Sequence, residues 1–151
     1  MVEVRLEPMT EDQYKPWRAG AEAHYAQSVA ASGQPARDAA RTAAATYAQL
    51  LPDEFASPDH YFWYACDGDR RVGFLWVKVT NNTAFVYNVA VEPDVRRRGY
   101  GRAIMLAAER WCRDNALTRI GLHVFAHNVG ARALYEQLGF AETGRNLAKD
   151  L

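Results

Sequence analysis

The residues of this chain that could do chemistry gather in its C-terminal half, around a short loop of arginines and glycines. Arg96–Arg98 run directly into Gly99, and a second glycine, Gly101, follows two residues later. A strand pattern, Thr83–Val91, precedes this loop, and a helical pattern begins at about Gly101. The first turn of a helix has unpaired backbone N–H groups that favour an anion, and glycine lets the backbone approach a ligand closely. The spacing therefore indicates a cradle for a phosphorylated ligand.

Other interpretations of the loop are an ordinary surface turn and a nucleic-acid patch. The turn stays open on the loop alone, because short glycine motifs often occur without function. Nucleic acid is disfavoured because Lys plus Arg equals Asp plus Glu at 18 each, and no second basic motif accompanies the loop. A dinucleotide fold is disfavoured because Ile104 stands where a third glycine belongs. A P-loop is excluded, because the G-K-[ST] sequence is missing.

Two further residues lie on one predicted helix, Asn128–Leu138, whose first residue is an N-cap candidate and which Gly139 ends. Asn128 and Tyr135 are seven residues apart, so they share a helix face about 10 Å apart along the axis. One long ligand could touch both. The alternative for Tyr135 is a core aromatic, because positions 131, 134, 135 and 138 all follow inward spacing.

A candidate base lies on the preceding strand, which the alternation predicts over Arg119–Ala126. His123 stands between Leu122 and Val124, and alternation places its side chain on the opposite face from both. Histidine titrates near neutrality, so it can act as a base, although a structural histidine is an equal alternative. Weaker candidates are Asn88, His24 and His127.

The rest of the chain predicts an α/β protein with a sheet of mixed direction. A strand is expected over Val2–Leu6, followed by a helix that Thr10 caps and that Pro16 either kinks or makes start later. A second helix follows Ser32–Pro35 and ends at Pro52. The expected later strands are three antiparallel ones, Tyr61–Cys66, Val72–Val79 and Thr83–Val91, and a last one from Phe140 onward.

Length and composition predict one ordinary globular domain, residues 1–151, with Cys66 and Cys112 as buried reduced thiols. The first residues lack the basic start and apolar stretch of a signal peptide. No apolar run approaches the roughly 20 residues that a membrane helix needs. We therefore expect a cytoplasmic protein without membrane or nucleic-acid partners.

Two motifs together resemble one known family. Arg96-x-x-Gly99-x-Gly101 is similar to the acyl-CoA loop signature [QR]-x-x-G-x-[GA] of the GCN5-related N-acetyltransferase (GNAT) superfamily. The second signature, N-x-x-A-x-x-L-Y-x-x-x-G-F, matches from Asn128 to Phe140. The resemblance runs without a gap from Tyr87 to Phe140. It implies the GNAT fold: an antiparallel N-terminal meander, a V-shaped gap between the fourth and fifth strands, and about four helices.

The resemblance also implies the ligand, acetyl-CoA, as co-substrate without a metal. The fourth strand would pair with the pantetheine arm, the loop would hold the pyrophosphate by its backbone N–H groups, and the last helix would contact the arm and the sulfur. The expected contact residues are Val89, Val91, Arg96, Arg97, Arg98, Gly99, Tyr100, Gly101, Arg102, Ala103, Asn128 and Tyr135.

The implied reaction is direct acetyl transfer to a primary amine, with Tyr135 as the acid that protonates the departing thiolate. The fourth strand carries Phe85 and Tyr87 where some relatives have a base, while His123 takes a position where others have a glutamate. A non-catalytic acyl-CoA sensor of the same fold is therefore the alternative. Asp53, Glu54 and Asp59 are a faint sign of a site for a cationic acceptor, and a homodimer is left open.

Overall fold

The computed structural model describes residues 1–151 and has the predicted α/β architecture, with four helices and five strands. The helices are α1 (Glu11–Ala31), α2 (Ala36–Leu50), α3 (Tyr100–Asp114) and α4 (Val129–Gln137), and the strands are β1 (Arg5–Pro8), β2 (His60–Asp67), β3 (Arg70–Thr80), β4 (Thr83–Val91) and β5 (Arg119–Leu122). Two short 3₁₀ turns, Glu54–Ala56 and Pro93–Val95, lie in the connections.

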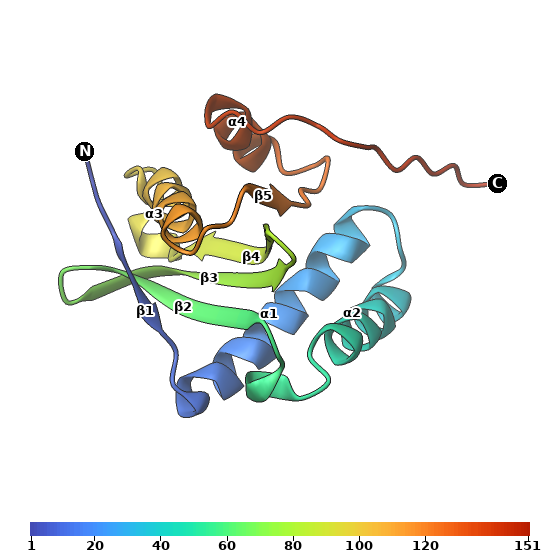
Figure 1. Cartoon of the computed structure of the whole chain (residues 1–151). Coiled ribbons are helices and arrows are strands. Elements are labelled where there is room, and N and C mark those ends of the chain that lie inside the picture. The colour runs from blue at the N-terminus through green and yellow to red at the C-terminus, as the bar shows by residue number, and fades with distance from the viewer.

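The five strands form one sheet in the order β1-β2-β3-β4-β5 (Figure 1). The first four strands are antiparallel, which confirms the predicted meander, and β5 lies parallel to β4 after the crossover through α3. Gly68 and Asn81 have positive φ in the two tight hairpins, as such turns require. The predicted mixed sheet is therefore confirmed.

Helices cover both faces of the sheet, and each face has its own core. On one face α3 packs Ile104 and Met105, both fully buried, against Leu75 of β3. On the other face α1 and α2 lie over an aromatic cluster that includes Trp17 and Trp76. Leu75 and Trp76 are neighbours in sequence, so the alternation of β3 alone sends one side chain into each core.

The N-terminal half follows its local signals closely. The Thr10 hydroxyl accepts from the backbone N–H of Gln13 at 3.2 Å, and the Gln13 side chain accepts from the Thr10 N–H at 2.8 Å, so the predicted capping box is present. Pro16 lies inside α1, and the helix still begins at Glu11, so the predicted later start is wrong. Cys66 and Cys112 are free and buried, as predicted. None of the helices has the length and apolar character needed to cross a membrane.

The first strand differs from its prediction, because it spans Arg5–Pro8 and not Val2–Leu6. Its position is set by its partner: Arg5 lies opposite Cys66 and Pro8 opposite Trp63. Val2 and Val4 lie beyond that pairing and pack instead against the core under α3. Tertiary contact therefore overrides the local alternation.

The C-terminal end departs most from prediction. The fifth strand ends at Leu122 and not at Ala126, because beyond Leu122 it has no neighbouring strand with which to hydrogen-bond. The predicted strand from Phe140 onward is wrong, since no helix or strand follows α4. Beyond Phe140, which packs against the core, this segment is mainly polar and its leucines, Leu147 and Leu151, are exposed, so it has no alternating pattern to bury.

Candidate functional site

The central feature of the site is the separation of β4 from β5. The two strands pair only where Thr83–Val86 of β4 lie beside Arg119–Leu122 of β5. Beyond Val86, β4 continues to Val91 with β3 on one side and no strand on the other. This is the V-shaped gap that the resemblance implied. The half-buried residues Val89 and Val91 lie on this stretch, so their backbone lies at an open sheet edge, where an extended ligand could pair.

A β-bulge lies at the point where the gap opens. Trp76 of β3 pairs with Asn88, whereas the next residue, Val77, pairs with Val86, so Tyr87 is the extra residue. As a result Val86 and Val89 both pack toward the α3 core, while Tyr87 joins the aromatic cluster under α1 and α2. The bulge thus places two consecutive side chains, Tyr87 and Asn88, at the gap on the α1/α2 side.

Asn88 is close to a buried phenol. Burial raises the pKa of Tyr47 to about 12, and the nearby Asn88 amide and the positive charge of Arg18 partly offset this effect. The Arg18 guanidinium lies over the Tyr47 ring, 5.3 Å from its centroid. Asn88, a weaker candidate base from the sequence, therefore lies beside the Tyr47 phenol. The raised pKa means that Tyr47 keeps its proton at neutral pH.

The loop after β4 has the backbone geometry that an anion cradle requires. Arg97 and Gly99 both have positive φ, at 65° and 86°, and α3 begins directly after Gly99. No backbone N–H from Arg97 to Arg102 donates to any group of the chain, whereas the N–H of Ala103 donates to the Gly99 carbonyl at 3.1 Å. Successive unpaired N–H groups at a helix N-terminus are the arrangement that binds phosphate. Of the backbone N–H groups predicted to hold the pyrophosphate, that of Ala103 is therefore the least available.

The arginine side chains add unpaired positive charge to this cradle. Arg97, Arg98 and Arg102 are exposed and form no salt bridge within the chain. Arg96 is different, because its Nε donates to the Val91 carbonyl at 3.3 Å. A ligand that pairs with the β4 edge at Val91 must therefore share that carbonyl or displace Arg96.

Two contacts that the sequence did not indicate brace the loop against the β2–β3 hairpin. The Tyr100 hydroxyl donates to Asp67 Oδ2 at 2.6 Å, and Arg70 pairs with Asp94 at 2.6 Å. Tyr100 is nearly buried, so only its backbone faces the cradle. No motif marks this brace, because its partners are 33 and 24 residues apart and meet only through the fold.

The last helix closes the other side of the cradle. Leu134 of α4 lies so near Gly101 that a Cβ there would be 3.4 Å from its Cδ2 atom. Asn128 caps α4 as predicted, with Oδ1 accepting from the Ala131 N–H at 3.4 Å, which leaves its NH₂ group free to donate. Both predicted α4 residues, Asn128 and Tyr135, thus belong to an element that packs on the loop.

Tyr135 is half-buried, and its ring packs edge-on against Phe140 at 5.6 Å. Burial raises the pKa of the Tyr135 phenol. Its hydroxyl forms no hydrogen bond with another side chain, unlike that of Tyr100. The phenol therefore keeps its proton at neutral pH and has a free donor, and packing occupies only its ring.

His123 lies just past the end of β5. Its ring meets Phe125 edge-on at 5.0 Å, and Phe125 in turn lies 6.1 Å from Tyr25 of α1. Leu122 packs on the opposite, α3 side, so the alternation predicted for His123 is present. His123 is exposed at the α1/α2 side of the gap.

The weaker candidates lie apart from one another. His127 stacks on Phe125 at 5.4 Å, whereas His24 is exposed on α1. Glu54 is engaged by the Tyr14 hydroxyl and by Arg18 Nε, both at 2.9 Å. The Arg18 guanidinium thus pairs with the one carboxylate of the faint acidic cluster, Glu54, that these contacts engage.

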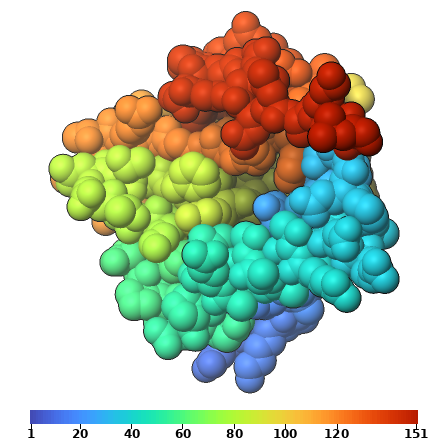
Figure 2. Space-filling view, turned by 90° about the vertical axis from the view of Figure 1, so that its right-hand side faces the viewer, coloured from blue at the N-terminus to red at the C-terminus, as the bar shows by residue number.

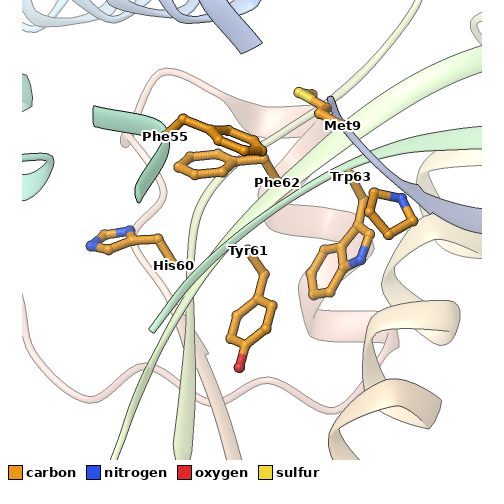
Figure 3. Close-up of a pocket in the computed structure, with 7 residues that line it drawn as sticks. Met9, Phe55, His60, Tyr61, Phe62 and Trp63 are labelled. Atoms are coloured by element: carbon orange, nitrogen blue, oxygen red, sulfur yellow. The ribbon is translucent and has the colours of Figure 1, made fainter. Parts of the chain in front are cut away.

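A pocket of about 180 Å³ lies elsewhere, between the end of β1 and the start of β2 (Figure 3). Its side chains are Pro8, Met9, Phe55, His60, Tyr61, Phe62 and Trp63. His60 accepts from Trp76 Nε1 at 2.9 Å, and burial lowers its pKa, so the ring is a neutral structural group. The pocket holds none of the predicted site residues and lies two strands away from β4.

Comparison with known proteins identifies the family to which this geometry belongs. Residues 12–140 match the Acetyltransferase (GNAT) family. The chain belongs to the GNAT family. This GNAT chain is 30% identical to YycN of Bacillus subtilis, named as an uncharacterized N-acetyltransferase, over 98% of this chain and 99% of that protein. The crystal structure of YycN superimposes with a TM-score of 0.93, covering 98% of both chains.

Two other N-acetyltransferases are similar over shorter stretches or at lower identity. The [ribosomal protein bS18]-alanine N-acetyltransferase of Salmonella typhimurium is 38% identical over 49% of this chain and 50% of that protein. PaiA N-acetyltransferase from Thermoplasma acidophilum, solved in complex with coenzyme A, is 17% identical with a TM-score of 0.69 over 93% of this chain and 91% of that one. At that identity the PaiA likeness shows the fold alone.

Proposed function

We propose that this chain is a single acetyltransferase domain that moves an acetyl group directly from acetyl-CoA to a primary amine. The observation that carries the proposal is the row of unpaired N–H groups from Arg97 to Arg102, which opens beside the unpaired stretch of β4. A pyrophosphate fits the first feature, and an extended amide-containing arm fits the second. Acetyl-CoA carries both, joined in that order.

Each part of the ligand then has a partner in the chain. The N–H groups of Arg97–Arg102 hold the pyrophosphate, with the exposed arginines adding charge. The pantetheine arm pairs with β4 at Val89 and Val91, and the free amide NH₂ of Asn128 donates to it. The thioester then lies where the gap opens, between Tyr87 and α4.

The transfer follows from these positions. The neutral amine attacks the thioester carbonyl carbon, a C–N bond forms, and the C–S bond breaks. Tyr135 donates its phenolic proton to the departing thiolate, so that CoA leaves as the thiol. The nitrogen releases one proton, which His123 accepts, directly or through water, and a proton returned to Tyr135 from solvent restores the acid.

The environment of Tyr135 supports this role. Burial raises its pKa, so the phenol remains a proton donor throughout the neutral range. A hydroxyl without a partner side chain is free to turn toward a ligand. A non-catalytic CoA sensor is the second candidate, favoured by Phe85 and Tyr87, which supply no base on β4.

Thiol release in the presence of amines tests the proposal. Purified protein is given acetyl-CoA with a panel of primary amines and N-terminal peptides, and free CoA is followed with a thiol reagent while the acetylated product is detected by mass. We expect amine-dependent CoA release with one acetyl group per thiol. Acetyl-CoA binding without release for any amine would support the sensor, and absence of binding would reject both functions.

A further inference from the structure

A series of aromatic side chains borders the gap on the α1/α2 side of the sheet. The ring centroids lie 4.8 Å apart for Phe85–Tyr87, 5.0 Å for Tyr87–Trp76, 5.3 Å for Trp76–Tyr47, 5.8 Å for Tyr47–Tyr25 and 6.1 Å for Tyr25–Phe125. The series starts on β4, passes through both helices and ends on the segment after β5. We call these six residues the aromatic border.

The border follows from features already described. Ordinary alternation places Phe85 and Tyr87, two residues apart on β4, on this side, and the bulge adds Asn88 beside Tyr87. Phe125 lies beyond the end of β5, where the chain has left the sheet, and so it reaches Tyr25 of α1. Figure 2 shows this side of the molecule, where the surface is hollowed between the C-terminal segment, the β4 region and the first two helices.

The border is only partly covered by the fold. Trp76 and Tyr47 are buried, at 1% and 3% exposure, whereas Tyr25, Phe85 and Phe125 are half-buried. Partly exposed rings on three separate elements leave apolar surface in contact with water. Small-molecule sites have this character, with mainly apolar and aromatic walls and few polar groups.

The charges near the border argue against a polycationic acceptor. Glu22, one turn before Tyr25 on α1, is already paired with Arg18. Glu54, the other carboxylate that Arg18 contacts, is also engaged by Tyr14. A polyamine or an aminoglycoside carries several ammonium groups and needs several free carboxylates, and both carboxylates that Arg18 contacts are already paired. Aromatic faces can still attract a single ammonium group.

We propose that the acceptor is a primary amine on a short alkyl arm attached to an aromatic ring. The proposal rests on the function proposed above. The ring of the acceptor packs against Tyr25 and Phe125, and the arm carries the nitrogen past Tyr87 to the thioester. The transfer is the one already written: the nitrogen gains the acetyl group and loses one proton, and the CoA sulfur gains one.

Three acceptors separate the contributions of shape, charge and aromatic character. We compare 2-phenylethylamine, 2-cyclohexylethylamine and spermidine at saturating acetyl-CoA, and measure kcat/KM from CoA release. kcat/KM should be about fivefold higher for 2-phenylethylamine than for 2-cyclohexylethylamine, because pairs of aromatic rings stabilise a complex beyond the effect of the area that they bury. kcat/KM for 2-phenylethylamine should also exceed that for spermidine by about tenfold or more, since only one of the three ammonium groups of spermidine can reach the border.

Variants locate the effect on the border. Phe125→Leu and Tyr25→Leu keep apolar bulk and remove the ring, so each should raise KM for 2-phenylethylamine about five- to tenfold. KM for acetyl-CoA should stay within about twofold, because neither residue belongs to the cradle. Tyr61→Leu is the matched control: this tyrosine is 39% exposed and packs on Trp63 and Trp111, away from the border.

The outcomes distinguish the proposed acceptor class from the acetyltransferase function on which it rests. Spermidine or a peptide used in preference to 2-phenylethylamine would overturn the acceptor class and leave the acetyltransferase function intact. An unchanged KM for the aromatic amine in both border variants would also overturn it. If no amine releases CoA, the proposed function fails and the acceptor class falls with it.

Discussion

The hydroxyl of Tyr100 donates a 2.6 Å hydrogen bond to the carboxylate of Asp67, and so the first residue of α3 is tied to the β2–β3 hairpin. The hydrogen bond to Asp67 raises the pKa of Tyr100, so the contact persists through the neutral range. Because the proposed pyrophosphate cradle lies at this end of α3, the hairpin braces the proposed ligand site through a contact outside it.

Removal of this hydrogen bond should weaken cofactor binding more than turnover. Tyr100→Phe and Asp67→Ala should each raise KM for acetyl-CoA severalfold, while kcat stays within about twofold, since the chemistry is unchanged. Tyr64→Phe is the control, because that hydroxyl has no side-chain partner. Steady-state kinetics with acetyl-CoA as the varied substrate measure KM and kcat separately. A fall in kcat alone would contradict a positioning role.

The glycines of the cradle give a sharper test of binding. Gly99 has a φ of 86°, and Gly101 faces Leu134, so Gly99→Val and Gly101→Val should strain the loop or block its approach to pyrophosphate. Saturating acetyl-CoA should raise the Tm of the wild-type protein and leave that of both variants unchanged.

The control for the glycine experiment is Gly144→Val, in the C-terminal segment, where a new side chain meets nothing within 4 Å. It should keep the full Tm shift. A normal shift in both cradle variants would reject the assignment of the loop to the pyrophosphate.

Tyr135→Phe tests the proposed acid, because it keeps the ring against Phe140 and deletes only the hydroxyl. We expect kcat to fall about 10²-fold on the scale of general acid catalysis, with little change in acetyl-CoA affinity. The raised pKa of Tyr135 means that the acid is lost only above the ordinary phenol range, near pH 10, so wild-type kcat should hold to at least that pH.

A packing role for Tyr135 predicts the opposite result. Tyr135→Phe would then turn over at the wild-type rate, and only Tyr135→Ala would matter, by lowering the free energy of unfolding by about 3 kcal/mol or less at this half-buried site. Chemical denaturation of both variants distinguishes the two outcomes.

His123→Ala tests the base. A general base takes up the proton that the attacking amine loses, so the variant should lower kcat/KM by about 10²-fold while acetyl-CoA affinity stays nearly constant. His127→Ala, a neighbour that also contacts Phe125, serves as the control and should keep the wild-type rate. An unaltered rate for His123→Ala would leave water as the proton acceptor.

The sequence predicted those parts of the fold and the site that local physics determines. Thr10 and Asn128 act as caps, and the arginine–glycine loop enters α3 as its spacing indicates, because capping and helix entry depend on residues within one or two turns. The strand ends were less predictable: β5 stops at Leu122 since β4 leaves it there, which no residue of β5 itself records.

Long-range partners were the least predictable part of the site. The bulge at Tyr87 appears only in the register between β3 and β4, and the Tyr25–Phe125 contact joins residues 100 positions apart. Alternation did place Leu122 on the α3 side, because that residue still belongs to β5.

The four-residue pairing of β4 with β5 also bears on how the chain opens. α4 has no fully buried residue, and β5 is held to the sheet by its one partner over four positions, so this segment is weakly anchored. Segments with few buried contacts open locally at a free energy below that of global unfolding. A ligand that pairs with β4 and contacts α4 bridges the opening. On the proposed function, the hydrogen bonds that hold acetyl-CoA would also hold β5 and α4 to the sheet, so amide exchange in β5 and α4 should slow when acetyl-CoA is added.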